Sequence, residues 1–211
     1  MIRPRVWSVV ALAALASCSR GAKTGAVPEE TPRPLQAFAA QRIILTPTTR
    51  VTAYSTSDTL GTEPRPQAEA RAFDEELARR LRERGLTSTW ILPVDLMRAH
   101  ERNRTYAPDP YNLATDPVRS PRFVAGSKFG EPLSSQLRTM IALHEEARYI
   151  LMPIVLRLNQ NGRTSLRLAL LDPRFAEARW VGEVSSDSAI AQPQTALTQV
   201  ARRVADLFAA P

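Results

Sequence analysis

Two stretches of the chain carry apolar side chains at three- and four-residue steps, the spacing that gives an α-helix one apolar face. The first covers residues 67–84, and its apolar face consists of Ala70, Phe73, Leu77 and Leu81. Gly85 follows it, and glycine favours the positive φ of a helix C-terminal cap. The second covers residues 194–209, with an inner face of Leu197, Val200, Val204 and Leu207. Both helices are predicted to pack on an apolar surface.

Two shorter helices and a long loop are predicted in the middle of the chain. Asp95 can cap a helix that extends through Arg102, because its carboxylate accepts free backbone N–H groups. Residues 133–147 form the other helix. Between them, residues 103–132 hold five prolines, too many for any regular element. Loops this long inside a compact domain are often functional.

Apolar runs bounded by turn residues predict the strands. The clearest pair covers residues 149–158 and 164–171, on either side of Asn161-Gly162. This dipeptide favours the type I′ turn of a β-hairpin. Further strands are predicted at residues 43–45, 89–94 and 179–184.

The predicted order of elements is β-α-β-α-loop-α-β-β-β-α. The economical fold for this order is α/β (α+β), with a single mixed β-sheet and helices packed on it. Residues 42–211 are expected to form one domain. A domain of this length can bury its own hydrophobic core.

The N-terminal residues have the pattern of a secretion signal. Arg3 and Arg5 precede an apolar run over residues 6–15, and the small residues Ala16 and Ser17 follow. The run is about ten residues long, well short of the roughly 20 that span a bilayer as a permanent helix. Residues 1–17 are therefore expected to be a signal peptide.

Leu15, Ala16, Ser17 and Cys18 resemble the bacterial lipobox, the motif at which lipoproteins are cleaved and acylated. Cys18 is the only cysteine of the chain and occupies the position that the lipobox requires. The resemblance implies that Cys18 carries the acyl chains of a membrane anchor. The alternative is an ordinary signal peptide with an incidental cysteine.

The residues after the cysteine predict the location and a tether. Because Ser19 rather than Asp follows Cys18, the resemblance implies an outer-membrane lipoprotein that faces the periplasm. Residues 18–41 are rich in Gly, Ala, Thr and Pro, and this composition favours a flexible tether. With Cys18 acylated, the domain can form no internal disulfide.

The charge of the chain is basic but dispersed. The formal net charge is +7, and losing Arg3 and Arg5 lowers it by two, to +5. The arginines are scattered through helices, strands and loops, with acidic residues between them. The dispersal of the arginines and the predicted location outside the cytoplasm argue against nucleic acid as a partner. Attraction to an anionic lipid or lipopolysaccharide surface is the alternative to an ordinary solvated surface.

The order of elements over residues 42–209 resembles the α/β domain shared by the N-terminal part of TolB, the curli-channel subunit CsgG and the outer-membrane lipoprotein activators of penicillin-binding proteins. The matching stretches are residues 94–97, 145–152 and 168–172, together with Trp180. The chain departs from the pattern at Glu146 and Arg148 and in the turn after Asp172. The resemblance implies an envelope protein with this fold. Residues 103–132 lack the alternating apolar residues of a transmembrane hairpin, so a pore subunit is not expected.

The sequence shows no catalytic constellation and no metal or cofactor motif. His100 and His144 lie on separate predicted helices, away from any partner at ligand spacing, and are expected at the surface or its boundary. Asp74, Glu75 and Glu76 are adjacent, so their carboxylates point about 100° apart. They are expected on the solvated face of their helix. The sequence therefore predicts a protein that is not an enzyme and needs no metal and no cofactor.

The long loop interleaves cationic and aromatic side chains, a combination enriched where proteins bind one another. In the alternative interpretation the rings pin the loop to its own domain, and both hold if some rings face inward. The candidate partner-binding residues are Arg102, Arg104, Tyr106, Tyr111, Arg119, Arg122, Phe123, Lys128 and Phe129.

Together these features predict a membrane-anchored accessory lipoprotein that binds a periplasmic or outer-membrane protein partner. One alternative is a glycan- or small-molecule-binding module associated with peptidoglycan. Such a module would need a concave pocket with a few convergent polar groups. The other alternative is a structural envelope protein that assembles with copies of itself.

Overall fold

The computed structural model describes residues 33–53, 66–145, 147–158, 163–187 and 193–209. The predicted signal peptide, the lipobox with Cys18 and the Asn161-Gly162 turn lie outside the described residues. No helix within the described ranges is long and apolar enough to cross a membrane.

A single mixed sheet organises the fold, as the sequence predicted. β3 (Tyr149–Leu158) is central: β1 (Ile43–Leu45) and β2 (Val51–Ala53) pair with it in parallel, one after the other along the same edge. β4 (Thr164–Asp172) pairs with the other edge of β3 in the antiparallel sense, and β5 (Glu177–Ser185) pairs likewise with β4. The α/β (α+β) class and the predicted β3–β4 pairing are confirmed.

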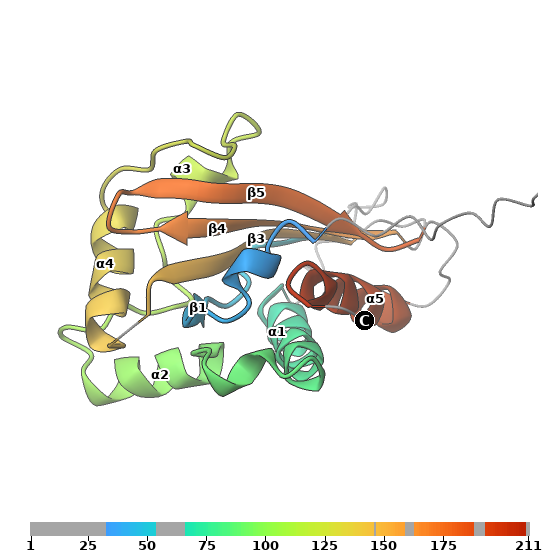
Figure 1. The fold of residues 1–211 in the computed structure, drawn as a ribbon, viewed down its shortest axis with the longest axis horizontal. Helices are drawn as coiled ribbons and strands as arrows, with labels where there is room; N and C mark the ends of the chain where they lie inside the picture. The colour runs from blue at the N-terminus through green and yellow to red at the C-terminus, as the bar shows by residue number, and fades with distance from the viewer. Residues whose placement is uncertain (1–32, 54–65, 146, 159–162, 188–192, 210–211) are drawn as a thin grey trace, which may run out of the picture. The chain divides into compact units, whose positions relative to one another are not determined.

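Helices and the long loop bury both faces of this sheet (Figure 1). α1 (Pro66–Glu83) and α5 (Pro193–Asp206) lie side by side on one face, over an apolar cluster that includes Phe73, Leu168 and Val200. α3 (Asp116–Arg119), α4 (Leu133–Leu143) and the loop cover the other face. α2 (Pro93–Arg102) joins that second cluster through Leu96. Because both of its faces are covered, β4 is buried along its whole length.

The pairing of β3 with β4 shifts at Pro153, and the stretch between β1 and β2 lies along the other edge of β3 at the same level. Proline has no backbone N–H to donate, and a register shift lies between Pro153 and Val155. At this level β1 has ended and β2 has not begun. Thr49 donates its backbone N–H to the Pro153 carbonyl at 3.2 Å. Residues 46–50 therefore follow the sheet without forming a strand, and Thr48 faces α1.

The second predicted strand, residues 89–94, does not form. Only Ile91 pairs, in a single parallel bridge with β1. Pro93 cannot donate the N–H that would extend a strand, and its fixed φ suits the first turn of α2 instead. Asp95 consequently does not precede the helix as a cap. It lies in the first turn, and its carboxylate accepts the backbone N–H of Leu92 at 3.2 Å.

The folded domain begins before residue 42, which corrects the predicted extent of the tether. Residues 33–41 include a 3₁₀ turn, Gln36–Phe38. Leu35 is fully buried, and its N–H binds the carbonyl of Leu207 at 3.1 Å. At the other end, α5 stops at Asp206, and Phe208 rather than Leu207 enters the core.

Three other boundaries differ from the predictions. β2 is only three residues long and was not predicted. α3 forms inside the loop, because Pro117 lies in its first turn, where no N–H is required. α4 ends at Leu143 rather than residue 147. The cap of α1 is as predicted, since Gly85 has a φ of +71°.

Gly182 of β5 lies against the indole of Trp180, since residues two apart on a strand share a face. A Cβ at residue 182 would lie 2.3 Å from the nearest indole carbon. The indole packs on the apolar cluster under α1 and α5. We expect Gly182→Ala to lower the free energy of unfolding by about 1–3 kcal/mol, measured by urea denaturation. Gly130→Ala is the control, because nothing lies within 4 Å of its added Cβ. Equal stabilities of the two variants would contradict this expectation.

Candidate binding groove

Two adjoining hollows lie between α1, α2 and the long loop. The first has a volume of about 530 Å³ and the second of about 500 Å³. They share Arg71, Met97 and Tyr111 and together form the α1–α2 groove. The first hollow is also lined by Thr48, Thr49, Arg50, Val51, Ala70 and Asp109. The second is also lined by Asp74, Glu75, Ala78, Arg79, Arg82, Leu92, Pro93 and Val94.

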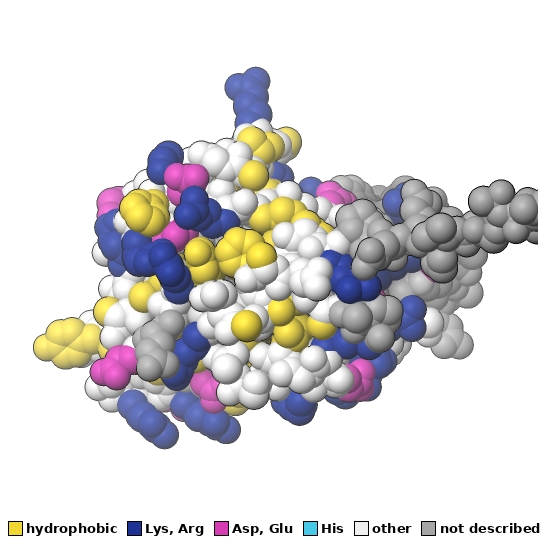
Figure 2. Space-filling model, in the orientation of Figure 1, with side chains coloured by type: hydrophobic (Ala, Val, Ile, Leu, Met, Phe, Trp, Pro, Cys, Tyr) yellow, Lys and Arg dark blue, Asp and Glu magenta, His cyan; other side chains and the backbone are white. Residues whose placement is uncertain are grey.

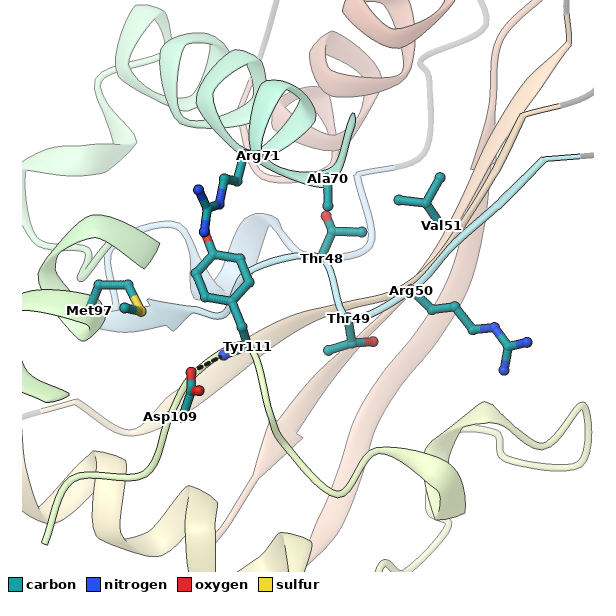
Figure 3. A pocket seen from close by; sticks show the side chains of 9 residues that line it. All are labelled: Thr48, Thr49, Arg50, Val51, Ala70, Arg71, Met97, Asp109 and Tyr111. Atoms are coloured by element: carbon teal, nitrogen blue, oxygen red, sulfur yellow. Dashed lines mark hydrogen bonds between the residues drawn. The ribbon is translucent and has the colours of Figure 1, made fainter. Parts of the chain in front are cut away.

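The groove follows from the helical spacing of α1. Its wall is a stripe beside the buried apolar face, made of residues at three- and four-residue steps: Arg71, Asp74, Glu75, Ala78, Arg79 and Arg82. The opposite wall is the start of α2, which Leu96 fixes in the core. Thr48 enters from residues 46–50, and Tyr111 enters from the loop (Figure 3).

Asp74 is the buried acidic residue of the groove. It is only 5% exposed, and Thr48 donates to its Oδ1 both a backbone N–H at 2.9 Å and its hydroxyl at 2.6 Å. Its other oxygen, Oδ2, is buried and has no hydrogen-bond partner. The prediction that Asp74 lies on the solvated face is therefore wrong. The position of Asp74, four residues after Ala70 and three before Leu77, was the sequence signal for this burial.

Burial raises the pKa of the Asp74 carboxyl from 3.8 to about 7. The two hydrogen bonds from Thr48 act in the opposite direction, and the charge of Glu75 adds to the rise. Near neutral pH, the carboxyl group of Asp74 is therefore present in both its neutral and its charged form. Buried carboxyl groups with strongly shifted pKa values in a cleft are candidates for functional groups.

Tyr111 lines both hollows, and its ring extends from the loop towards α1 (Figure 3). The guanidinium carbon of Arg71 lies 5.7 Å from the ring centre. The Tyr111 backbone N–H binds the carboxylate of Asp109 at 2.9 Å, which fixes the turn that carries the ring. Partial burial raises the pKa of the Tyr111 phenol, and the nearby Asp74 adds to the rise. The side chain remains partly exposed and accessible to a ligand.

Arginines dominate the rim of the groove. Arg50 and Arg82 are exposed, and neither forms an ion pair with another described residue. Arg79 is engaged by carboxylates of its own helix, at 2.6 Å from Glu76 and 2.8 Å from Glu83. On the face of the molecule in Figure 2, basic side chains are dispersed among acidic ones and form no broad patch.

The structure places the candidate loop residues in different surroundings. Phe123 and Phe129 are 4% and 3% exposed and belong to the core, so these two rings pin the loop to its own domain. Tyr111 alone lines the groove. Lys128 pairs with Glu177 at 2.6 Å, and Arg119 pairs with Asp116 at 2.6 Å. The remaining candidates are exposed outside the groove: Arg102, Arg104, Tyr106 and Arg122.

Arg167 of β4 ties the loop to the sheet. It is 9% exposed and donates to the carbonyl of Phe123 at 2.6 Å and to that of Arg119 at 3.3 Å. Arg119 ends α3, so the second bond satisfies a carbonyl that the helix leaves free. The Gly126 N–H also binds the Ala178 carbonyl of β5 at 2.8 Å. These bonds hold the loop that carries Tyr111.

The two histidines lie outside the groove. The Nδ1 of His100 lies 2.8 Å from the Ala107 carbonyl. His144 is half-buried, and burial lowers its pKa. Within the part of the chain that the structure describes, no group of three or more His, Cys, Asp or Glu side chains could hold a metal ion. The groove itself offers an apolar floor, one buried acceptor, an aromatic ring and a cationic rim, which are the components of a binding site.

No protein-family model and no curated protein matches the chain. Solved structures that resemble it include two of the PelC dodecamer from Paraburkholderia phytofirmans, at 13% and 14% identity with TM-scores of 0.39 and 0.38. Each likeness covers 86% of this chain and 96% of that chain. The LpoB C-terminal domain from Salmonella enterica is another, at 12% identity and a TM-score of 0.35, over 75% of this chain and 87% of that chain. TM-scores this low assign neither a family nor a function, so the proposals below rest on the chain's own residues.

Proposed function

We propose that the chain is a non-enzymatic accessory lipoprotein of the cell envelope that binds a protein partner through the α1–α2 groove. In this proposal Cys18 is acylated and anchors the protein to the outer membrane, with the folded domain facing the periplasm. The lipobox pattern at residues 15–18 supports both the acylation of Cys18 and the location in the cell envelope. The groove supports the binding role.

The observation that carries the proposal is the apolar floor of the second hollow. Val94 is 52% exposed beside the buried residues Leu92 and Pro93, and the half-buried Ala78 and Met97 line the same hollow. An exposed apolar side chain within an apolar concave site is typical of surfaces that bind a partner. Arginine and tyrosine at the edge of such a floor are the residue types enriched in protein interfaces.

The first hollow supports a second candidate function, a glycan-binding module. The sequence-based condition for that alternative was a concave pocket with convergent polar groups. Thr48, Thr49, Arg50 and Asp109 line such a pocket next to Tyr111. Hydroxyl and carboxylate groups beside an accessible aromatic ring suit a sugar. The two candidate functions therefore differ in where a substitution should abolish binding. Protein binding should depend on the second hollow, and glycan binding on the first.

Crosslinking in intact cells of the producing organism tests the proposed function. We expect the native lipidated chain to capture one stoichiometric envelope protein. Val94→Arg should reduce its recovery about tenfold, the effect of losing about 1.4 kcal/mol of binding free energy. Val124→Arg is the matched control, because Val124 is 57% exposed and lies outside both hollows.

The alternative outcomes identify the other functions. Equal recovery with Val94→Arg and Val124→Arg would remove the groove from the proposal. Capture of peptidoglycan fragments alone, lost on Thr49→Val, would establish the glycan-binding module. Capture of only further copies of this chain would establish a self-assembling structural protein.

A further inference from the structure

We infer that the partner segment in the α1–α2 groove is an acidic peptide that inserts an apolar side chain into the second hollow and donates an uncharged hydrogen bond to Oδ2 of Asp74. This inference rests on the proposed function, since it specifies the chemistry of the protein partner. Three features of the groove carry it: the apolar floor, the unpartnered carboxyl oxygen and the arginine rim.

The floor determines the inserted group. Leu92, Pro93, Val94 and Met97 of the α2 side face Ala78 of α1 across the second hollow. Val94 is 52% exposed, so a large part of its surface is solvated while the groove is empty of partner. An apolar side chain of the partner would remove this surface from water, which is the main favourable contribution to most protein associations. A short peptide can supply one such side chain at the centre of its contact.

The ionised form of Asp74 lacks a donor at one oxygen. Its Oδ1 receives both hydrogen bonds from Thr48, whereas Oδ2 is buried without any partner. Only 5% of the surface of Asp74 is exposed, and the residue lines the second hollow. Buried polar atoms are nearly always hydrogen-bonded, because an unsatisfied one loses the interaction that water provides. A partner N–H or O–H inserted beside Asp74 in the second hollow would satisfy this oxygen once the neighbouring side chains move aside.

The surrounding charges favour an uncharged donor. Arg71 and Arg82 line the second hollow with the acidic residues Asp74 and Glu75, and the third arginine, Arg79, is engaged by Glu76 and Glu83. The phenol of Tyr111 lines the hollow as well, and Thr48 contacts Asp74. A lysine or arginine of the partner would be repelled by Arg71 and Arg82 beside the carboxyl group. A serine or threonine hydroxyl, an amide or an indole N–H meets no such repulsion.

The same rim attracts acidic residues on either side of the inserted group. Arg82 at the second hollow and Arg50 at the first form no ion pair with another described residue. Carboxylates of a bound peptide can therefore pair with them without displacing an existing partner. Exposed charges of this kind guide association and fix the register of a peptide more than they raise its affinity. The charge complement of the groove is thus an acidic peptide with an uncharged, apolar centre.

The inference is tested with a phage-displayed library of random dodecapeptides, selected on the full lipidated chain in lipid nanodiscs. We expect the selected peptides to carry Asp or Glu around an apolar residue that adjoins a Ser, Thr, Asn, Gln or Trp. The affinity of the best synthetic peptide is then compared across variants. Asp74→Asn, which keeps the shape but presents an amide, should weaken it at least tenfold.

A matched pair of charge reversals tests the role of the arginine rim. Arg82→Glu should weaken the same peptide about fivefold or more, with the loss reduced at high salt. Arg122→Glu makes the same change at an exposed arginine outside both hollows and should leave affinity within twofold. Thermal unfolding of each variant establishes that it is folded. If Asp74→Asn does not fold, Thr48→Val replaces it, since it removes the hydroxyl donor to Oδ1, leaves only the backbone N–H bound there, and should change affinity more than twofold.

The outcomes distinguish this inference from the proposed function. Selected peptides that are basic, a failure to select any peptide, or affinity unchanged in Asp74→Asn would overturn the inference. If crosslinking to the cellular partner is still lost in Val94→Arg, the proposed function stands while the inference fails. If crosslinking is also unaffected by Val94→Arg, both fail. A selected peptide that competes with the crosslinked partner and depends on Asp74 and Arg82 would support both.

Discussion

Replacement of Asp74 by Asn is expected to remove a pH-dependent contribution to stability of about 4 kcal/mol, because burial shifts one pKa by about three units. The native carboxyl group has a pKa of about 7 in the folded protein and an ordinary value of 3.8. Between these values the folded state holds a proton that the unfolded state has lost. Acidification from pH 7 to pH 4 therefore stabilises the native chain through this group. Above pH 7 both states are ionised, and the contribution is absent.

Urea unfolding at a series of pH values measures this effect. The difference in unfolding free energy between the native chain and Asp74→Asn should shift in favour of the native chain as the pH falls from 8 to 4. Taking the difference cancels the other titrating groups, including the ion-paired carboxylates with lowered pKa values, such as Glu76 and Glu177. Glu75→Gln is the control, because it leaves Asp74 in place and removes only the weakest contribution to its raised pKa, so most of the pH dependence should remain. A difference that stays constant with pH would show that Asp74 titrates as an ordinary exposed aspartate.

Replacement of Arg167 by Met is expected to release the long loop, with a loss of about 2–3 kcal/mol in the free energy of opening it. The side chain provides the donors for the carbonyls of Phe123 and Arg119. Methionine fills similar space but leaves both carbonyls without these donors. Local opening should become about 30-fold or more frequent, since 1.4 kcal/mol corresponds to a factor of ten. Partner binding should weaken as well, because Tyr111 is carried by this loop.

Native-state proteolysis with chymotrypsin measures the opening, since this protease does not depend on the arginine that is replaced. Cleavage after residues of the loop should accelerate in Arg167→Met. Arg157→Met is the matched control on the neighbouring strand, where the guanidinium reaches only the exposed Glu183 at 3.3 Å. Equal cleavage rates in the two variants would mean that the apolar contacts of Phe123 and Phe129 hold the loop without Arg167.

The parts of the fold that were predicted correctly depend on local patterns. The apolar spacing of α1 and the runs of β3 and β4 are properties of neighbouring residues, so the sequence alone reveals them. Residues 89–94 were predicted wrongly because their apolar composition outweighed Pro93, which is compatible with the start of a helix. β2 was not predicted because a strand of three residues is too short to show an alternation of apolar and polar side chains.

The groove was harder to predict because tertiary contacts create it. Thr48 reaches Asp74 from the stretch between β1 and β2, which is bonded to Pro153 about a hundred residues further along the chain. The spacing of Asp74 within α1 was a usable signal, although its two acidic neighbours suggested a solvated face. Which loop rings face inward depends on tertiary contacts, such as the packing of Phe123 and Phe129 in the core, which no local pattern records. Tyr111 could therefore be selected as a candidate from composition, but its place in the groove could not.

The bond between Leu35 and Leu207 brings the two ends of the described domain to one corner of the molecule. A linker of a few residues can join ends that lie this close without stretching the fold. The domain is therefore suited to circular permutation, in which the original ends are joined and new ends are opened in an exposed loop. In such a permuted chain the order of synthesis changes, whereas the sheet and the groove keep their neighbours. Comparing folding rates of the permuted and natural orders would show whether β1 has to be made before the hairpin that it joins.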